Sequence, residues 1–498
     1  MILFLASRPV VPTARRLSSA AFRSATGPRP GPPPRGTGAG PAAPRRTDDT
    51  DDTDNTDDGG AAAPEAGATP ARAARAPEAT GAHGPRTRPS PRSLIAPYRR
   101  LFAVPGAVAF TLAGLVGRVA GSMLGVGIVL MIATVRDSYA LAGAVSATGL
   151  AVTALTGPLL GRLVDRHGQA RVAVPAVAVY ALGATAMLLC VHYGAPAWAL
   201  FVCAVGSSGV PSLGSMTRAR WAAVHHDDPA ARHTANSFEQ VVDEVCFMAG
   251  PALAMVLCTA VFPEAGVATA AVLLVVGTLL FAAQRRTEPP PRTRATSAPG
   301  SGSGGAEGSL TRSPGLRVVV LTFLATGAVF GSMEVATVAA VESYGHGSAS
   351  SAVLALQAAG SCVAGLVFGA LPVRGSAATR FLAGVAAMAV AALPLLAANG
   401  LATLTPLLFV AGMATAPTMI SGMTLVHRLT PPTRLNEGMT TVYTGLLVGI
   451  SAGAAAGGWT VDHLGPAAGY TAPATAAALA LLAAAGGAGR LRRSLGAG

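Results

Sequence analysis

Long apolar segments recur along this chain from about residue 104 to residue 488, with short polar loops between them. Each segment is close to the ~20 residues that a helix needs to cross the hydrocarbon core of a bilayer. Only helices and closed barrels satisfy their backbone polar groups in lipid, and the sequence lacks the alternating strands of a barrel. We therefore predict an all-α membrane protein with twelve transmembrane helices. They lie near residues 104–134, 140–160, 172–193, 197–217, 237–260, 266–284, 317–341, 349–371, 379–397, 402–425, 436–459 and 467–488.

The composition agrees with a membrane protein. Hydrophobic residues make up 51% of the chain and charged residues only 12%, whereas a soluble protein carries about 25% charged residues. The formal net charge of +13 is also found in nucleic-acid-binding proteins. Here, however, the basic residues recur in short loops between apolar segments and do not form one patch. We therefore expect this chain to contact a lipid bilayer and not nucleic acid.

Two stretches of different composition divide the chain. Residues 1–95 are rich in Pro, Gly, Ala and Arg and lack apolar periodicity, so we predict a disordered tail. Residues 285–316 form a linker rich in Pro, Ser, Gly and Arg, with six predicted spans on each side. The folded regions are then a six-helix bundle at 96–284 and a second one at 317–489, followed by a short tail at 490–498.

Arginines are concentrated in alternate loops, with Arg136 as the clear exception. Loops rich in positive charge stay on the cytoplasmic side of a membrane. We therefore predict a multi-pass protein of the plasma membrane with both termini in the cytoplasm, which requires an even number of spans. The arginines on the cytoplasmic side are Arg99, Arg100, Arg162, Arg166, Arg171, Arg218, Arg220, Arg232, Arg285, Arg286, Arg292, Arg294, Arg374, Arg380, Arg428, Arg434, Arg490, Arg492 and Arg493.

The loop between the second and third predicted spans has a specific sequence. Residues 157–171 read Gly-Pro-Leu-Leu-Gly-Arg-Leu-Val-Asp-Arg-His-Gly-Gln-Ala-Arg. The pattern Gly161-x-x-x-Asp165-Arg166-x-Gly168-x-x-Arg171 resembles the loop that joins the second and third helices of major facilitator superfamily transporters. This resemblance implies two six-helix halves that rock about a central binding site.

In the resembled family, the aspartate of this loop lies near the start of the eleventh helix and helps to hold one end of the transporter shut. The resemblance therefore implies that Asp165 meets Asn436-Glu437-Gly438, because a helix N-terminus stabilises a carboxylate. Asn436 is the candidate cap of that helix. Arg218 or Arg220, at the end of the fourth span, is a candidate partner of Asp165. We assign to gating Gly161, Asp165, Arg166, Gly168, Arg171, Arg218 and Arg220.

Three acidic residues lie in the fifth predicted span: Glu239, Asp243 and Glu244. Ionisable groups inside a bilayer are costly and usually face a cavity or a partner. We expect Glu239 at the level of the lipid headgroups, where a charge is tolerated. Asp243 lies about two helical turns further in and is a candidate for proton coupling. For Glu244, both interpretations stay open.

Three polar residues elsewhere are further cavity candidates. Arg118, in the first span, either binds an anionic group or neutralises a carboxylate such as Asp243. Alternatively, the first span begins later and Arg118 extends to the membrane surface. We expect Glu334, deep in the seventh span, to face the cavity, and Gln357, in the eighth, to contact a polar substrate.

Gly250-Pro251 resembles the start of the glycine-proline motif in the fifth helix of antiporter-type members of the family. The further glycines of that motif are replaced by Ala252, Leu253 and Ala254. We predict a helix kink here, because proline removes a backbone donor. This partial motif is the support in the sequence for export.

The sequence offers no sign of an enzyme, a cofactor or a metal site. The five cysteines all lie in apolar segments, which argues against a disulfide framework. The run from His225 to Asp228 lacks the usual spacing of metal ligands. No nucleotide-binding loop is present, and Ser207-Ser208 lacks the spacing of a nucleophile elbow.

We therefore predict a monomeric secondary transporter that works by alternating access, with proton-coupled efflux of a small drug-like or metabolite molecule as the leading hypothesis. Import of a nutrient such as a sugar or organic acid by proton symport is the alternative. Two hypotheses from other classes are a membrane-embedded enzyme and a sensor that no longer transports.

Overall fold

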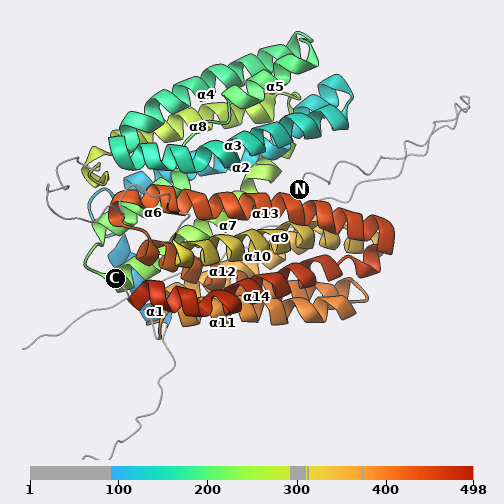
Figure 1. Cartoon of the computed structure of the whole chain (residues 1–498). Coiled ribbons are helices and arrows are strands. Elements are labelled where there is room, and N and C mark those ends of the chain that lie inside the picture. The colour runs from blue at the N-terminus through green and yellow to red at the C-terminus, as the bar shows by residue number, and fades with distance from the viewer. Residues whose placement is uncertain (1–90, 292–309, 311–312, 373–374, 497–498) are drawn as a thin grey trace, which may run out of the picture. The chain divides into compact units, whose positions relative to one another are not determined.

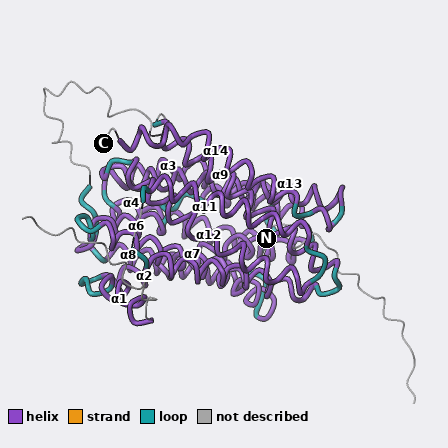
Figure 2. The backbone as a smooth tube through the Cα atoms, turned by 90° about the horizontal axis from the view of Figure 1, so that it is seen from below, coloured by secondary structure: helices purple, strands orange, loops and turns teal. Residues whose placement is uncertain are grey.

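The computed structural model describes residues 91–291, 310, 313–372 and 375–496. These residues form helices and loops, and no β-strand occurs among them (Figure 2). Most of the predicted tail, and most of the predicted linker, lie outside the described residues. The last residues of the predicted tail belong to a helix, α1 (Pro91–Leu101), which precedes the first span.

The twelve predicted spans correspond to thirteen helices. In the first half these are α2 (Ala107–Arg136), α3 (Tyr139–His167), α4 (Gln169–His192), α5 (Ala197–Gly206), α6 (Leu213–Val224), α7 (Pro229–Ala260) and α8 (Ala265–Ala283). In the second half they are α9 (Pro314–Ser343), α10 (Ser350–Ala370), α11 (Ala377–Ala392), α12 (Leu401–Leu429), α13 (Leu435–Leu464) and α14 (Thr471–Gly496). Short 3₁₀ helices occur at Arg285–Thr287 (η2), Gly347–Ala349 (η5), Leu393–Ala397 (η6), Pro432–Arg434 (η7) and Pro466–Ala468 (η8).

The fourth span is the one that the sequence analysis describes incorrectly. We predicted one continuous helix over 197–217, but the structure has two helices, α5 and α6, separated by residues 207–212. This interval contains Gly209 and Pro211, which disfavour a continuous helix. Among the described helices, eleven are long and apolar enough to cross a membrane, and α5 is a shorter apolar helix.

Helical structure extends into the predicted C-terminal tail at 490–498. Helix α14 continues to Gly496 and includes the arginines at positions 490, 492 and 493. Leucine and arginine are good helix formers, so a polar sequence does not end the helix there.

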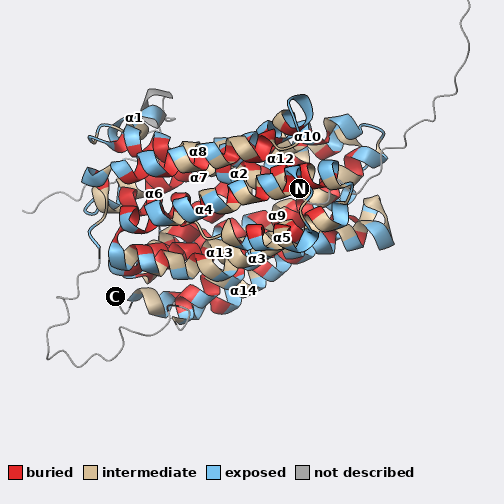
Figure 3. Ribbon diagram, turned by 90° about the horizontal axis from the view of Figure 1, so that it is seen from above, coloured by how far each residue is buried: buried red, intermediate tan, exposed pale blue. Residues whose placement is uncertain are grey.

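The outer faces of the helices are apolar. Large hydrophobic side chains such as Leu155, Leu182 and Leu482 are 74%, 73% and 68% exposed, and exposed positions alternate with buried ones along the helices (Figure 3). A water-soluble protein rarely exposes apolar surface on this scale. These faces are therefore suited to contact with lipid.

Small residues allow two helices of the second half to approach each other closely. Helices α9 and α13 lie side by side (Figure 1), and α13 has glycine at positions 445, 449, 453 and 457. A Cβ atom at Gly449 would collide with the carbonyl of Leu324, and one at Gly453 with the carbonyl of Ala328. This spacing brings the backbones together, as is common between helices in membranes.

Arg136, the exception to the arginine pattern, has a local partner. Its Nη2 donates to the carbonyl oxygens of Cys190 at 2.8 Å and Ala195 at 2.6 Å. The guanidinium therefore satisfies one carbonyl at the end of α4, where the helix dipole favours a positive charge, and one in the loop that follows. Its position is explained by this contact.

Candidate functional site

Asp165 joins the two halves of the protein at one end of the helices. We call this the motif end, defined by residues 161–168, at the end of α3 and its junction with α4, and by residues 435–438 of α13. The carboxylate of Asp165 accepts hydrogen bonds from the backbone N–H groups of Asn436 at 3.1 Å and Glu437 at 2.9 Å. It also accepts one from Nδ2 of Asn436 at 2.8 Å. The expected contact between Asp165 and the start of the eleventh span is therefore present, and the N-terminus of α13 stabilises the carboxylate.

Two ion pairs of Glu437 support this contact. Arg162 donates through Nη2 to Oε1 of Glu437 at 2.9 Å, and Arg434 donates to the same carboxylate at 2.8 Å. Glu437 is thus held between an arginine of α3 and one of η7. Asn436, which we expected to cap α13, instead lies inside the helix and donates to Asp165, because the helix begins at Leu435.

Arg218 and Arg220 do not contact Asp165, contrary to our prediction. Nε of Arg220 donates to Oε1 of Gln169 at 2.7 Å. Its Nη atoms donate to the carbonyls of Gln284 at 2.8 Å and Phe281 at 3.0 Å. The carbonyls at the end of α8 attract this guanidinium. Arg218 instead lies beside Asp243, as described below.

The two halves are also hydrogen-bonded between α7 and α10. Nε2 of His233 lies 2.9 Å from the carbonyl oxygen of Phe368, and Oγ1 of Thr234 donates to the carbonyl of Gly369 at 2.9 Å. The first turns of α7 thus satisfy carbonyls at the end of α10. Together with the α3–α13 contact, these bonds close the motif end along two seams.

Gly161 is placed where a side chain would separate the halves. A Cβ atom at this position would lie 2.8 Å from the carbonyl oxygen of Asn436 and 3.0 Å from Cα of Glu437. Backbone atoms cannot move aside as a flexible side chain can. Gly161 is therefore needed for the close approach of α3 to α13.

We expect Gly161→Val to destabilise the closed motif end by about 1–2 kcal/mol, which lowers the ratio of closed to open molecules roughly 5- to 30-fold. The measurement is the crosslinking yield of a cysteine pair introduced at His167 and Thr433, which are exposed on α3 and η7. Gly143→Val is the matched control on α3, because a Cβ there meets nothing within 4 Å. Equal yields for the two variants would contradict this role of Gly161.

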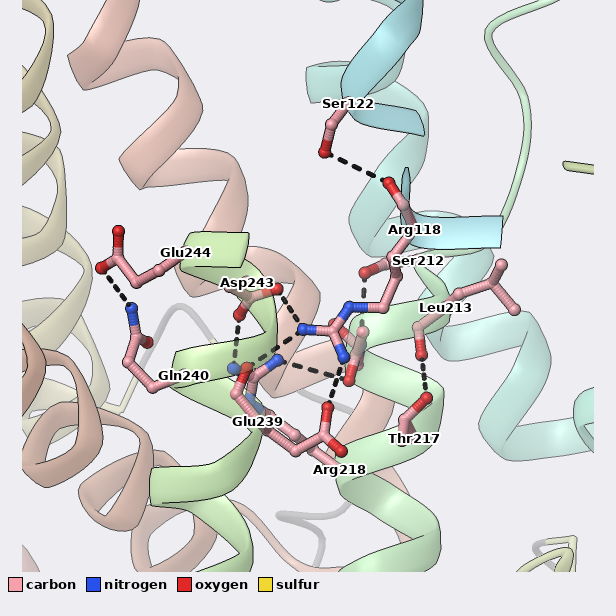
Figure 4. A network of polar contacts seen from close by, with 12 residues as sticks. Arg118, Ser122, Ser212, Leu213, Thr217, Arg218, Glu239, Gln240, Asp243 and Glu244 are labelled. Atoms are coloured by element: carbon pink, nitrogen blue, oxygen red, sulfur yellow. Dashed lines mark hydrogen bonds and ion pairs between the residues drawn. The ribbon is translucent and has the colours of Figure 1, made fainter. Parts of the chain in front are cut away.

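A buried ion cluster lies deeper in the first half (Figure 4). Arg118 of α2 donates through Nη1 to Oε2 of Glu239 at 2.5 Å, and its Nη2 pairs with Oδ1 of Asp243. Glu239 and Asp243 are four residues apart on α7, so they share a helix face. One guanidinium therefore binds both carboxylates.

Two further elements complete this cluster. Nη2 of Arg218, from α6, donates to Oδ2 of Asp243 at 2.5 Å. The hydroxyl of Tyr443, from α13, donates to the same oxygen at 2.7 Å. Nε1 of Trp221 donates to Oε1 of Glu239 at 2.8 Å. The cluster thus balances two arginines against two carboxylates and connects α2, α6 and α7 with α13 of the other half.

The cluster bears on two expectations. The side chain of Glu239 is fully buried within the protein and bonded to Arg118 and Trp221, and its expected position at the level of the headgroups stays a prediction. Arg118 does not extend to the surface, because 11 helical residues precede it in α2 and its side chain is only 8% exposed. Of the interpretations of Arg118, the structure shows the pairing with a carboxylate, Asp243. Burial of a charge is tolerated here because each charge has an oppositely charged partner.

The remaining candidates lie apart from this arrangement or at its edge. Glu244 contacts α10 and is considered below. Glu334 is half-buried in α9 and Gln357 half-buried in α10, and their cavity roles stay predictions. Arg166 and Arg171 are exposed, and neither forms an ion pair with another residue that the structure describes.

Two glycines of the predicted motifs have clear positions. Gly168 has φ +96°, in the region that favours glycine, at the junction of α3 and α4. At Gly250, a Cβ atom would lie 2.6 Å from Cβ of Ser122, so this residue allows α7 to approach α2. Helix α7 continues through Pro251 to Ala260. The predicted kink stays a prediction.

Trp221 and Tyr443 are site residues that the sequence analysis missed. Trp221 lies one turn after Arg218 on α6. This spacing indicates that an aromatic hydrogen-bond donor lies near the arginine. Tyr443 is 200 residues away from Asp243 in the sequence, and no local pattern indicates it. Within the described part of the chain, no group of three or more His, Cys, Asp or Glu side chains is placed to hold a metal ion.

The sequence of this chain matches the model of a known protein family. The sequence model of the Major Facilitator Superfamily matches residues 110–406, which is more than half of the chain. No curated protein sequence matches the chain significantly.

Solved structures share the fold. A bacterial homologue of the iron transporter ferroportin, in an outward-facing state, is 14% identical with a TM-score of 0.61, and the match covers 78% of this chain and 99% of that one. The human organic anion transporter MFSD10 is 13% identical with a TM-score of 0.56, over 76% and 98% of the two chains. The fucose:proton symporter FucP of E. coli is 13% identical with a TM-score of 0.57, over 80% and 99%. At these identities the likeness establishes the fold and not the substrate.

Proposed function

Because the chain belongs to the Major Facilitator Superfamily, whose members are membrane transporters and not enzymes, we propose that it exports a small molecule in exchange for protons by alternating access. The carrying observation is the closed motif end. Asp165, Arg162 and Gly161 of the first half meet the N-terminus of α13 in the second half. Contacts of this kind are few and polar, so they can break and re-form during a transport cycle.

The arginine pattern supports one orientation of the closed end in the membrane. We propose that the motif end faces the cytoplasm, with both termini there, and that the protein is a monomer in the plasma membrane. The structure is then closed to the cytoplasm. The apolar outer faces, exemplified by Leu155 and Leu182, support a lipid environment.

The buried ion cluster supports a central role for α7 in the cycle. Asp243 is bonded both to arginines of the first half and to Tyr443 of the second half. Movement of α13 relative to α7 would break the hydrogen bond between Tyr443 and Asp243. The hydrogen bonding of Asp243 is therefore coupled to the position of the second half. The substrate site is then expected next to this cluster, between the halves.

Proton coupling and export are the finer parts of the proposal. The support for export is Gly250-Pro251, which resembles the start of the antiporter motif. The second candidate function is import by proton symport, because the fucose:proton symporter has the same fold. A sensor that does not transport would retain the fold without any flux.

The test uses inside-out membrane vesicles with an acidic interior that is reported by a pH-sensitive dye. The added compounds are cationic drugs, sugars and small organic acids. We expect one class to dissipate the gradient in wild-type vesicles, and to do so about tenfold more slowly in vesicles with an equal amount of Asp165→Asn. Equal rates for every compound would contradict export of these classes. Uptake with protons into right-side-out vesicles would then support import.

A further inference from the structure

Two adjacent acids of α7 face different neighbours. Consecutive residues of an α-helix point about 100° apart, so Asp243 and Glu244 cannot share a partner set. Figure 4 shows Asp243 directed at Arg118 and Arg218, and Glu244 on another side of α7 beside Gln240. The two carboxylates are therefore in different chemical environments.

The hydrogen-bond donors to Glu244 are neutral. Its Oε1 accepts from the hydroxyl of Ser361 in α10 at 2.8 Å and from Nε2 of Gln240 at 3.2 Å. The Ser361 bond crosses between the two halves, within the α7–α10 seam. Glu244 is therefore a carboxylate at a contact that must open when the halves move.

The charged and titratable groups around Glu244 do not supply a positive partner. On α7 itself the neighbour is Asp243, and on α10 it is the thiol of Cys362. The arginines of α2 and α6, Arg118 and Arg218, are bonded to Asp243.

Helix α12, which also packs against α7, contributes His427, whose charged neighbours are Arg218 and Arg232. Within the described ion pairs, the acids of α7 that bind arginine are Glu239 and Asp243. Glu244 is thus set apart from its neighbours by the lack of an ion pair.

Glu244 is half-buried in α7, and a carboxylate that is largely removed from water needs a counter-charge. Asp243 has two guanidinium groups, which hold its negative charge in place. An ionisable group inside a bilayer without such a partner is costly and is a functional candidate by default. For Glu244, a proton taken up from water would neutralise this charge without any further ligand.

We propose that Glu244 binds and releases the coupling proton, and that its bond to Ser361 links this proton to the separation of α7 from α10. The proton is taken from water, adds to a carboxylate oxygen and later returns to water, and no other covalent bond changes. Hydrogen bonds to a charged acceptor are about twice as strong as those between neutral groups. Protonation therefore weakens the Ser361 bond and favours separation of the seam. This inference rests on the proposed transport function.

The test needs no substrate, because its probe is the proton alone. The purified full chain in lipid is titrated from about pH 4 to about pH 10, and infrared difference spectra follow the C=O stretch of protonated carboxyl groups. We expect wild type to show a carboxyl band that is lost in Glu244→Gln and kept in Glu334→Gln. We expect Ser361→Ala to move its half-point to higher pH by about one unit, which is a tenfold change in proton affinity.

Three outcomes would overturn the proposal: retention of the band in Glu244→Gln, its loss in Glu334→Gln, or an unchanged half-point in Ser361→Ala. Thermal unfolding and size-exclusion chromatography confirm that each variant is folded before its spectrum is compared. A band that behaves as expected in a protein without flux in the vesicle test would refute the transport function and leave the proton site intact.

Discussion

Asp243→Asn is expected to lower the free energy of unfolding by about 3–5 kcal/mol, because removal of one partner from a buried ion pair leaves its counter-charge unpaired. In wild type, Asp243 binds both Arg118 and Arg218. The side chain of Arg218 is 1% exposed, so water cannot replace the lost carboxylate. The amide of asparagine would leave two guanidinium groups with Glu239 as the remaining anion.

The measurement is equilibrium unfolding of the purified protein in mixed micelles, followed by tryptophan fluorescence. Trp221 donates to Glu239 and therefore reports on the cluster. The matched control is Asp462→Asn, since Asp462 is exposed on α13, and its effect is expected to stay within about 0.5 kcal/mol. The double variant Asp243→Asn/Arg218→Gln restores charge balance and should recover part of the loss. If Asp243→Asn changed the free energy of unfolding no more than Asp462→Asn does, the ion cluster would not stabilise the first half as proposed.

Asp165→Asn is expected to have the largest effect on the transport cycle. The substitution removes a charged acceptor that binds three donors of α13, and it places an amide N–H₂ group against a helix N-terminus. Hydrogen bonds to charged groups contribute about 1.5–3 kcal/mol. The closed motif end should therefore lose population relative to the open one by roughly 10- to 150-fold.

The vesicle assay measures this loss as a lower rate of substrate-dependent proton flux. Arg166→Gln is the control at the neighbouring position, because Arg166 is exposed and belongs to the same loop motif. We expect a change of less than about threefold for this control. If both variants lowered the rate of proton flux equally, the effect would belong to the loop as a whole, and the specific role of the Asp165–α13 contact would be contradicted.

The contact of Asp165 could be predicted because its loop resembles that of the major facilitator superfamily, in which this aspartate lies near the start of the eleventh helix. The stabilisation of a carboxylate by a helix N-terminus gives the physical reason for this contact. Arg118 could be assigned in part, since an arginine among apolar residues needs a carboxylate nearby. The sequence alone could not exclude the alternative that Arg118 extends to the membrane surface.

Other parts of the site could not be predicted for physical reasons. The break between α5 and α6 changes the direction of the residues that follow it, so Arg218 meets Asp243 and Arg220 meets the carbonyls of α8. A continuous helix through 197–217 would have placed both differently. The environment of Glu239 depends on Trp221 and Arg118 from two other helices, and packing between helices is not recorded in local spacing.

The most direct test of alternating access is a pair of distance measurements by electron paramagnetic resonance in lipid. One pair of spin labels joins His167 to Thr433 at the motif end, and the other joins Tyr139 to His463 at the opposite ends of α3 and α13; all four residues are exposed. The five native cysteines are first replaced. We predict a short-distance and a long-distance population at each end. Asp165→Asn should enlarge the long-distance population at the motif end and the short-distance population at the opposite end. A single distance at each end, unchanged by Asp165→Asn, would contradict the account.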